Sequence, residues 1–181
     1  MFTLLALLVA PRADDVLPVP ILELSEGDFV VGGYAGFGVF GADPFTRVWL
    51  ALTLDGVGSG PCGPNGLCLG VVHPTAFLWG SSGLTSIRIW DLGVPAWVAG
   101  HTVCAQAVAR VRGAWTASNV ECRDVTVAGD PIAWGAGEYL VTQNVLPRAD
   151  ADRVCAAVGM SVALPDDPAE AAFLTDALAA S

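Results

Sequence analysis

Residues 101–127, HTVCAQAVARVRGAWTASNVECRDVTV, decide the fold, because they contain two alternating strands around a turn. On the first arm one face is formed by small apolar side chains, which we expect to pack inward: Val103, Ala105, Ala107, Ala109 and Val111. The turn at 112–114 then places Cys104 and Cys122 opposite each other. This stretch therefore predicts an antiparallel hairpin joined by a disulfide.

The second arm fits this pattern less cleanly. Asn119, Glu121 and Arg123 fall opposite the small apolar residues of the first arm. A β-bulge or a different strand register would reconcile the two arms, and the sequence leaves both open.

Short segments of similar character precede the hairpin at intervals of roughly ten residues. They are rich in Val, Phe, Trp and Gly: LPVPILELSE (17–26), GDFVVGGYAGFGVFG (27–41), TRVWLALTLD (46–55), VVHPTAFLWG (71–80) and LTSIRIWDL (84–92). No helical periodicity precedes residue 148. The sequence thus predicts a mainly β protein, with an antiparallel β-sandwich over 14–128 rather than an α/β fold.

The chain contains five cysteines, which in an exported protein are expected to form disulfides. Cys62 and Cys68 bracket CGPNGLC, whose Pro-Asn-Gly turn brings its two ends together. A zinc site would need a second Cys/His pair, and redox chemistry favours the tighter CxxC, so a structural disulfide is preferred. With Cys104 and Cys122 paired across the hairpin, Cys155 is left unpaired.

The N-terminal residues MFTLLALLVAPRADD have an apolar core from Leu4 to Ala10, followed by the small residue Ala13. This arrangement predicts a secretory signal peptide over 1–13, although no basic residue precedes the core; a buried first strand is the alternative. No apolar run reaches the roughly 20 residues needed to span a bilayer. We therefore expect a secreted or cell-surface protein without a transmembrane segment.

The formal net charge is −10, from 18 acidic and 8 basic residues, and every basic residue is an arginine. The arginines do not cluster in the sequence. This charge argues against a polyanion such as nucleic acid as a partner. The charge by itself indicates no other partner.

Motifs that could carry catalysis lack the context that their chemistry needs. GFGVFG (36–41) fits the pattern G-x-G-x-x-G, but a β-rich segment follows it where a nucleotide site needs a helix. The serines in 58–60 and 80–83 lack the strand-turn-helix of a hydrolase nucleophile. His73 and His101 have no acidic or cysteine neighbour at ligand spacing. We expect no catalytic residue, cofactor or metal site.

Six tryptophans are many for a chain of this length: Trp49, Trp79, Trp90, Trp97, Trp115 and Trp134. Most lie in or beside apolar strands, so the ordinary interpretation places them in the core or at its rim. A row of aromatic side chains that stacks on sugars is the alternative.

The periodicity changes after Arg148. An apolar stripe at helical spacing is formed by Ala151, Val154, Cys155 and Val158, and Gly159 supplies the stop. Asp167, Pro168 and Glu170 then form a capping signature for a second helix. Its expected buried side comprises Ala171, Phe173, Leu174, Ala177 and Leu178. A boundary near 128–134 would separate a small α+β segment, 129–181, from the β-sandwich.

Within that segment, DADRVCAAVGMSVALPDDPAEAAFL (150–174) resembles the opening of a C-type-lectin-like domain. That family has an alanine and a cysteine on helix one, then Gly, then Leu-Ala, then Glu shortly before Phe-Leu on helix two. The matching positions here are Ala151, Cys155, Gly159, Val162-Ala163, Glu170 and Phe173-Leu174, with GEYLV (137–141) similar to the first strand. Arg148-Ala149 stands where the family often has tryptophan.

The resemblance implies a disulfide between Cys155 and a strand near the far end of a complete domain, beyond Ser181. The calcium- and sugar-binding residues of such domains would also lie beyond this chain, so the chain is expected to be part of a longer product and no ligand-binding residue can be assigned. Formylglycine-generating enzymes, with a related fold and a similar helix-Gly-Leu-Pro stretch, also have catalytic cysteines in that missing part. An unrelated helical hairpin closing the sandwich is the alternative.

Residues 14–128 also resemble Gly- and Cys-containing β-sandwich modules of large exported bacterial proteins, through GSGPCGPNGLCLG (58–70) and the AQAVA…SNV hairpin. This second resemblance implies no defined activity. The resemblance to a lectin-like domain instead implies a noncatalytic exported surface protein with a carbohydrate-binding, ligand-binding or adhesive role, whose partner would be a carbohydrate or another surface protein. The alternatives are an exported enzyme whose catalytic part is missing and a purely structural spacer.

Overall fold

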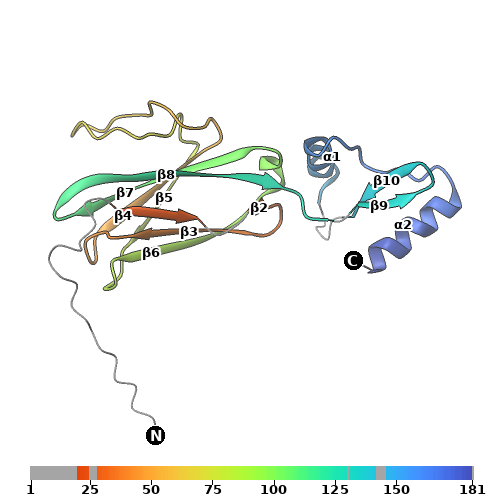
Figure 1. Ribbon diagram of the computed structural model, residues 1–181, viewed down its shortest axis with the longest axis horizontal. Coiled ribbons are helices and arrows are strands. Elements are labelled where there is room, and N and C mark those ends of the chain that lie inside the picture. Colours follow the sequence, from red (N-terminus) through yellow and green to blue (C-terminus); the bar gives the residue numbers. More distant parts are fainter. Residues whose placement is uncertain (1–19, 25–27, 130, 142–145, 181) are drawn as a thin grey trace, which may run out of the picture.

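The computed structural model describes residues 20–24, 28–129, 131–141 and 146–180 (Figure 1). The predicted signal peptide, 1–13, lies outside the described residues. Within them the chain forms the following elements: β1 (Ile21–Leu24), β2 (Phe29–Val30), β3 (Tyr34–Phe40), β4 (Arg47–Thr53), β5 (Ala76–Ser81), β6 (Ile87–Gly93), the 3-10 helix η1 (Ala96–Val98), β7 (Thr102–Val111), β8 (Ala114–Thr126), β9 (Pro131–Trp134), β10 (Gly137–Leu140), α1 (Arg148–Ala157) and α2 (Pro168–Ala180).

The strands of the described residues form three sheets. A three-stranded sheet has the order β1-β3-β6, a five-stranded sheet has the order β2-β8-β7-β4-β5, and β9 pairs with β10. All strand pairs are antiparallel except β2 with β8, which is parallel. The prediction of a mainly β protein with antiparallel sheets is therefore confirmed.

The two larger sheets share one hydrophobic core. On β7, Ala105, Ala107 and Ala109 are fully buried, so the face predicted to pack inward does so. The three-stranded sheet supplies larger side chains to the same cluster, among them Leu22, Phe37, Val39 and Trp90. Because alanine leaves space above β7, the bulk that fills the core comes from the opposite sheet.

A β-bulge accounts for the irregular second arm of the hairpin. The β7–β8 register shifts between Gln106 and Val108, and the Ser118 hydroxyl accepts the Ala107 N–H across the bulge at 2.9 Å. Beyond the bulge Cys104 pairs with Cys122. The sequence left a bulge and a different register open, and the structure has the bulge.

The Asn119 side chain links the two larger sheets. Its amide oxygen accepts the N–H of Leu22 at 2.8 Å, and its amide nitrogen donates to the carbonyl of Leu22 at 3.0 Å. The side chain thus takes the place of a neighbouring strand for β1. This explains why a polar residue stands on β8 opposite the small apolar side chains.

The two helices contact different parts of the molecule. Val154 of α1 is buried in the core of the two larger sheets, and α1 lies against η1 (Figure 1). In contrast, Phe173 of α2 stacks on Trp134 with ring centroids 4.6 Å apart and meets Tyr139 edge-on at 6.0 Å. Helix α1, although it follows the expected boundary at 128–134, therefore packs on the residues before it.

The helix signals are confirmed at the caps and only partly along the faces. Asp167 accepts the N–H groups of Ala169 and Glu170, each at 2.8 Å, and the Glu170 carboxylate accepts the N–H of Asp166 at 2.7 Å. Val158 is 42% exposed because α1 ends before it, and Leu178 is 61% exposed. The other expected buried-face residues of α2 are half-buried: Ala171, Phe173, Leu174 and Ala177.

Candidate functional site

The outer face of the five-stranded sheet carries large aromatic and cationic side chains. On β4 the buried Val48 and Leu50 alternate with Arg47 and Trp49, so the latter two point away from the core. The same alternation brings residues of β5, β7 and β8 to that side. We call these six residues the aromatic face: Arg47, Trp49, Phe77, Trp79, Arg110 and Trp115.

Strand register places the aromatic side chains next to one another. Trp49 pairs directly with Trp79 across β4 and β5, and their ring centroids lie 6.5 Å apart. Arg110 pairs with Trp115 across β7 and β8. Trp79 is 61% exposed and Phe77 is 54% exposed, whereas Trp49 and Trp115 are half-buried. Aromatic surface is thus presented to solvent along three adjacent strand pairs.

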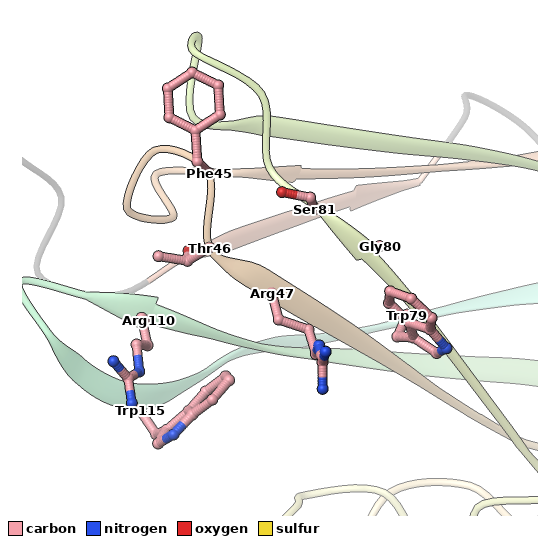
Figure 2. Close-up of a pocket in the computed structure, with 8 residues that line it drawn as sticks. All are labelled: Phe45, Thr46, Arg47, Trp79, Gly80, Ser81, Arg110 and Trp115. Carbon is pink, nitrogen blue, oxygen red and sulfur yellow. The ribbon is translucent and has the colours of Figure 1, made fainter.

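Each arginine of the face lies over an indole ring. The guanidinium carbon of Arg47 is 5.0 Å from the ring centroid of Trp79 and 5.7 Å from that of Trp49. The corresponding distance from Arg110 to Trp115 is 5.3 Å. At these distances a cation–π attraction holds each guanidinium group against an indole ring at the surface. Figure 2 shows Arg47 between Trp79 on one side and Arg110 with Trp115 on the other.

A cavity of about 440 Å³ opens at this cationic end (Figure 2). Its lining consists of Phe45, Thr46, Arg47, Trp79, Gly80, Ser81, Arg110 and Trp115. The Thr46 hydroxyl donates to the Asp43 carbonyl at 2.7 Å, which leaves its lone pairs available. Among the residues that the structure describes, none with an acidic side chain belongs to this lining.

A second cavity, of about 680 Å³, lies at the apolar end of the aromatic face beneath the 61–69 loop. Besides loop residues, its lining includes Trp49, Phe77, Val108 and Trp115. Trp115 therefore borders both cavities. This lining also lacks acidic side chains.

The loop that overhangs the second cavity is rooted on the sheet. Val71 at its base is fully buried against Ala51 and Cys104, in a small second core on the outer side. The Gln106 side-chain oxygen accepts the N–H of Gly70 at 2.6 Å. The 62–68 disulfide closes the tip of the loop. The overhang is consequently held at both its base and its tip.

The structure corrects the ordinary interpretation of the tryptophans. Among the described tryptophans only Trp90 is buried, whereas Trp79 and Trp97 are more than half exposed. The physical reason is strand alternation, since Arg47 shares its face with Trp49 while the core takes the aliphatic residues between them. The position of arginine in RVWLAL is the signal that identifies the outer face.

Other residues singled out in the sequence do not come together in a site. The 36–41 glycine motif lies mostly within β3, with no helix after it. His73 Nδ1 lies 3.3 Å from the Asp55 carboxylate, a contact that the sequence did not predict, but both side chains are highly exposed. His101 follows η1 at the surface. Among the described residues no group of three or more His, Cys, Asp or Glu side chains is placed to hold a metal ion.

The cysteines have the arrangement expected from the sequence. Cys62 is bonded to Cys68 and Cys104 to Cys122, and Cys155 on α1 is free and half-buried. Disulfides of this kind persist in oxidising compartments.

No helix in the described part of the chain is long and apolar enough to cross a membrane. In comparisons with known proteins, no family model and no curated protein matches this chain.

Proposed function

We propose that this chain is a noncatalytic, exported binding protein that holds a carbohydrate on the aromatic face. The observation that carries the proposal is the pair formed by the half-buried Trp49 and the exposed Trp79, side by side on the outer face of a sheet with a cavity at each end. Indole rings pack against the C–H surfaces of sugar rings and bury apolar area in doing so. A sheet surface suits this role because its strands present the rings in a row.

The exposed area of these side chains argues for a ligand. Leaving large aromatic groups in water forfeits the hydrophobic free energy that their burial would contribute, and clusters of such groups mark binding sites. The overhanging loop adds an apolar wall beside Trp115 and Phe77. An extended glycan could therefore lie along the sheet and under the loop.

Tryptophan and arginine are also frequent in protein–protein hot spots. The cavities favour a glycan, because they leave recesses beside the rings that a chain of small rings fills readily. A protein partner is an outcome that the test must distinguish. A structural spacer, the third possibility, would bind neither.

The test compares two exposed tryptophans. Trp79→Ala removes half of the stacking pair, whereas Trp97→Ala removes a side chain that is 51% exposed but lies on η1, outside the aromatic face. On a glycan array and by calorimetry we expect the parent and Trp97→Ala to bind the same glycans and Trp79→Ala to lose about tenfold or more in affinity. The absence of glycan binding by the parent, or equal loss in both variants, would overturn the proposal.

We also propose that the two larger sheets form a β-sandwich and that the chain is exported. The shared core between the sheets supports the first statement, and the two disulfides support the second. Mass spectrometry of protein recovered from the medium of the producing cells tests export. A chain retained inside the cells with reduced cysteines would contradict it.

For residues 129–181, the similarity to a C-type-lectin-like domain stays a proposal. It is supported by the order of hairpin, α1, Gly159 and α2, and by the free thiol of Cys155 on α1. Thiol counting on the denatured, nonreduced protein should give one free thiol. Three or five free thiols would contradict the disulfide assignment.

A further inference from the structure

We propose that the cavity between Arg47 and Arg110 is a subsite for one acidic sugar, so that the preferred ligand is a largely neutral glycan carrying a single carboxylate or sulfate. This inference rests on the proposed function, because it names the class of carbohydrate that the aromatic face selects. It also gives Arg47 and Arg110 a role in recognition, whereas stacking of sugars on the indole rings would not need the arginines.

The first argument is charge. The chain carries 18 acidic residues against 8 arginines, yet the described residues that line the two cavities of the aromatic face include no acidic one. Asp43, on the neighbouring turn, accepts the backbone N–H groups of Arg112 and Gly113, each at 2.7 Å, and does not line the cavity. The cavity therefore has a local positive charge within an acidic protein.

The second argument is that the guanidinium groups of Arg47 and Arg110 have no polar partner among the described residues. Ion pairs there engage Arg123, Arg148 and Arg153, but these two guanidinium groups form neither ion pairs nor hydrogen bonds. Their contacts are with indole faces, which leave the N–H edges free. A guanidinium edge presents parallel donors that match a carboxylate or sulfate.

The third argument is that indole rings and hydroxyl groups surround these guanidinium donors. The rings of Trp79 and Trp115 lie beside the arginines, and the hydroxyl groups of Thr46 and Ser81 belong to the same lining. A sugar ring could stack on an indole while its acidic group meets a guanidinium and its hydroxyls meet Thr46 or Ser81. This combination of an apolar wall, polar atoms and cations fits an acidic sugar better than a neutral one.

Size and net charge limit the ligand to few anionic groups. A volume of about 440 Å³ lies within the range of small-molecule sites. The net charge of −10 repels an extended polyanion, whereas at physiological salt a charge more than about 8 Å away is largely screened. A single anionic group at the cavity thus meets the two arginines without facing the rest of the acidic surface.

The experiment uses matched pairs of glycans in calorimetry with the whole chain. The pairs are lactose with sialyllactose, xylotetraose with the same tetraose bearing one glucuronic acid, and lactose with its monosulfate. In at least one pair we expect the acidic member to bind about tenfold more tightly, and its affinity to fall as salt is raised. The sialic acid and glucuronic acid pairs test a carboxylate and the monosulfate pair tests a sulfate, so the experiment shows which anionic group the cavity prefers.

Charge-neutralising variants assign this preference to the cavity. Arg47→Gln and Arg110→Gln should each weaken the acidic member about tenfold and leave the neutral member within about twofold. Arg112→Gln, an exposed arginine on the turn next to Arg110, makes the same change in net charge and should have little effect. Near-ultraviolet circular dichroism checks that the indole environment of each variant is retained.

The outcomes separate the two proposals. If neutral and acidic glycans bind equally well and the arginine variants change neither, the acidic subsite is wrong while the aromatic face stands. If no glycan binds, both proposals fail. Preferential binding of long polyanions such as single-stranded DNA, or an equal loss in Arg112→Gln, would also overturn the subsite.

Discussion

The two faces of the five-stranded sheet differ in the side chains they carry and in how far those side chains are buried. The inner face of β7 is a row of fully buried alanines, and that of β4 carries Val48 and Leu50. On the outer side the same two strands present Arg47, Trp49 and Arg110. One alternating sequence therefore builds a dry core and a wet aromatic surface.

This difference separates stability from binding. Burial of aliphatic side chains stabilises the fold, so changes on the inner face should unfold the protein. The outer aromatic groups retain much of their exposure and contribute less to folding. Substitutions on the two faces should accordingly produce different losses.

The largest expected effect tests this contrast directly with neighbouring strands. Leu50→Ala on the inner face should cost about 3 kcal/mol in free energy of unfolding, because it leaves a cavity in a packed core. Phe77→Ala, at an exposed position on β5, should cost about 1 kcal/mol or less although it removes a larger side chain. Urea titration followed by circular dichroism measures both. Equal losses would remove the distinction between the faces.

The second prediction concerns the two disulfides. Replacing both Cys104 and Cys122 by alanine should destabilise the fold by about 3 kcal/mol, since this bond closes the longer loop, with a sequence separation of 18. Replacing Cys62 and Cys68 should cost less, because their separation is 6 and they lie at the surface. Glycan binding should show the opposite order, because the second pair shapes the overhanging loop. A single order for both measurements would contradict this assignment.

The third prediction sharpens the role of the link between the sheets. Asn119→Ala removes two hydrogen bonds to the backbone of Leu22 and should cost about 1 kcal/mol. Asn119→Asp is a second test of the same link: it keeps the acceptor but loses the donor and adds a charge next to Glu121. Both should lower the urea midpoint, with unchanged glycan binding. A variant that loses binding but keeps its stability would assign Asn119 to the outer face instead.

The last prediction concerns the base of the loop, where stability and glycan binding should fall together. At Gly60 an added Cβ would lie 2.0 Å from the carbonyl oxygen of Val71, so Gly60→Ala must displace the loop base. Gly83→Ala is the matched control, because the nearest atom there would be 3.8 Å away. We expect Gly60→Ala to cost about 2 kcal/mol in free energy of unfolding, because the clash is with backbone, and to give NMR shift changes at Trp115 and weaker glycan binding. Unchanged binding would show that the overhang does not form part of the site.

Local patterns account for what the sequence could predict. Strand positions, the pairing of Cys104 with Cys122 and the cap at Asp167 depend on residues close in sequence or symmetric about a turn. The bulge at Gln106 lies within the hairpin, and the local pattern left it open beside a different register. The Asn119 link depends on Leu22, nearly a hundred residues earlier, so no local pattern reveals it. Long-range register decides such features.

The candidate site illustrates the same limit. Each arginine and tryptophan of the aromatic face is visible in the sequence, but the apolar strands around the tryptophans assigned them to the core or its rim. Only the neighbours of Trp49, with Arg47 two residues before it, show that it faces outward. The meeting of Trp79, Arg110 and Trp115 requires the strand order β8-β7-β4-β5, which the sequence does not specify.

The position of β7 has a consequence for amide hydrogen exchange. This strand is paired along both edges, with β4 and β8, and Cys104 ties it covalently to the latter. Because each amide of β7 donates to only one of the two neighbours, fraying of a single neighbour releases only part of the strand. The slowest exchanging amides of the protein should therefore lie in β7. Their exchange rate should report unfolding of the two larger sheets together rather than a local fluctuation.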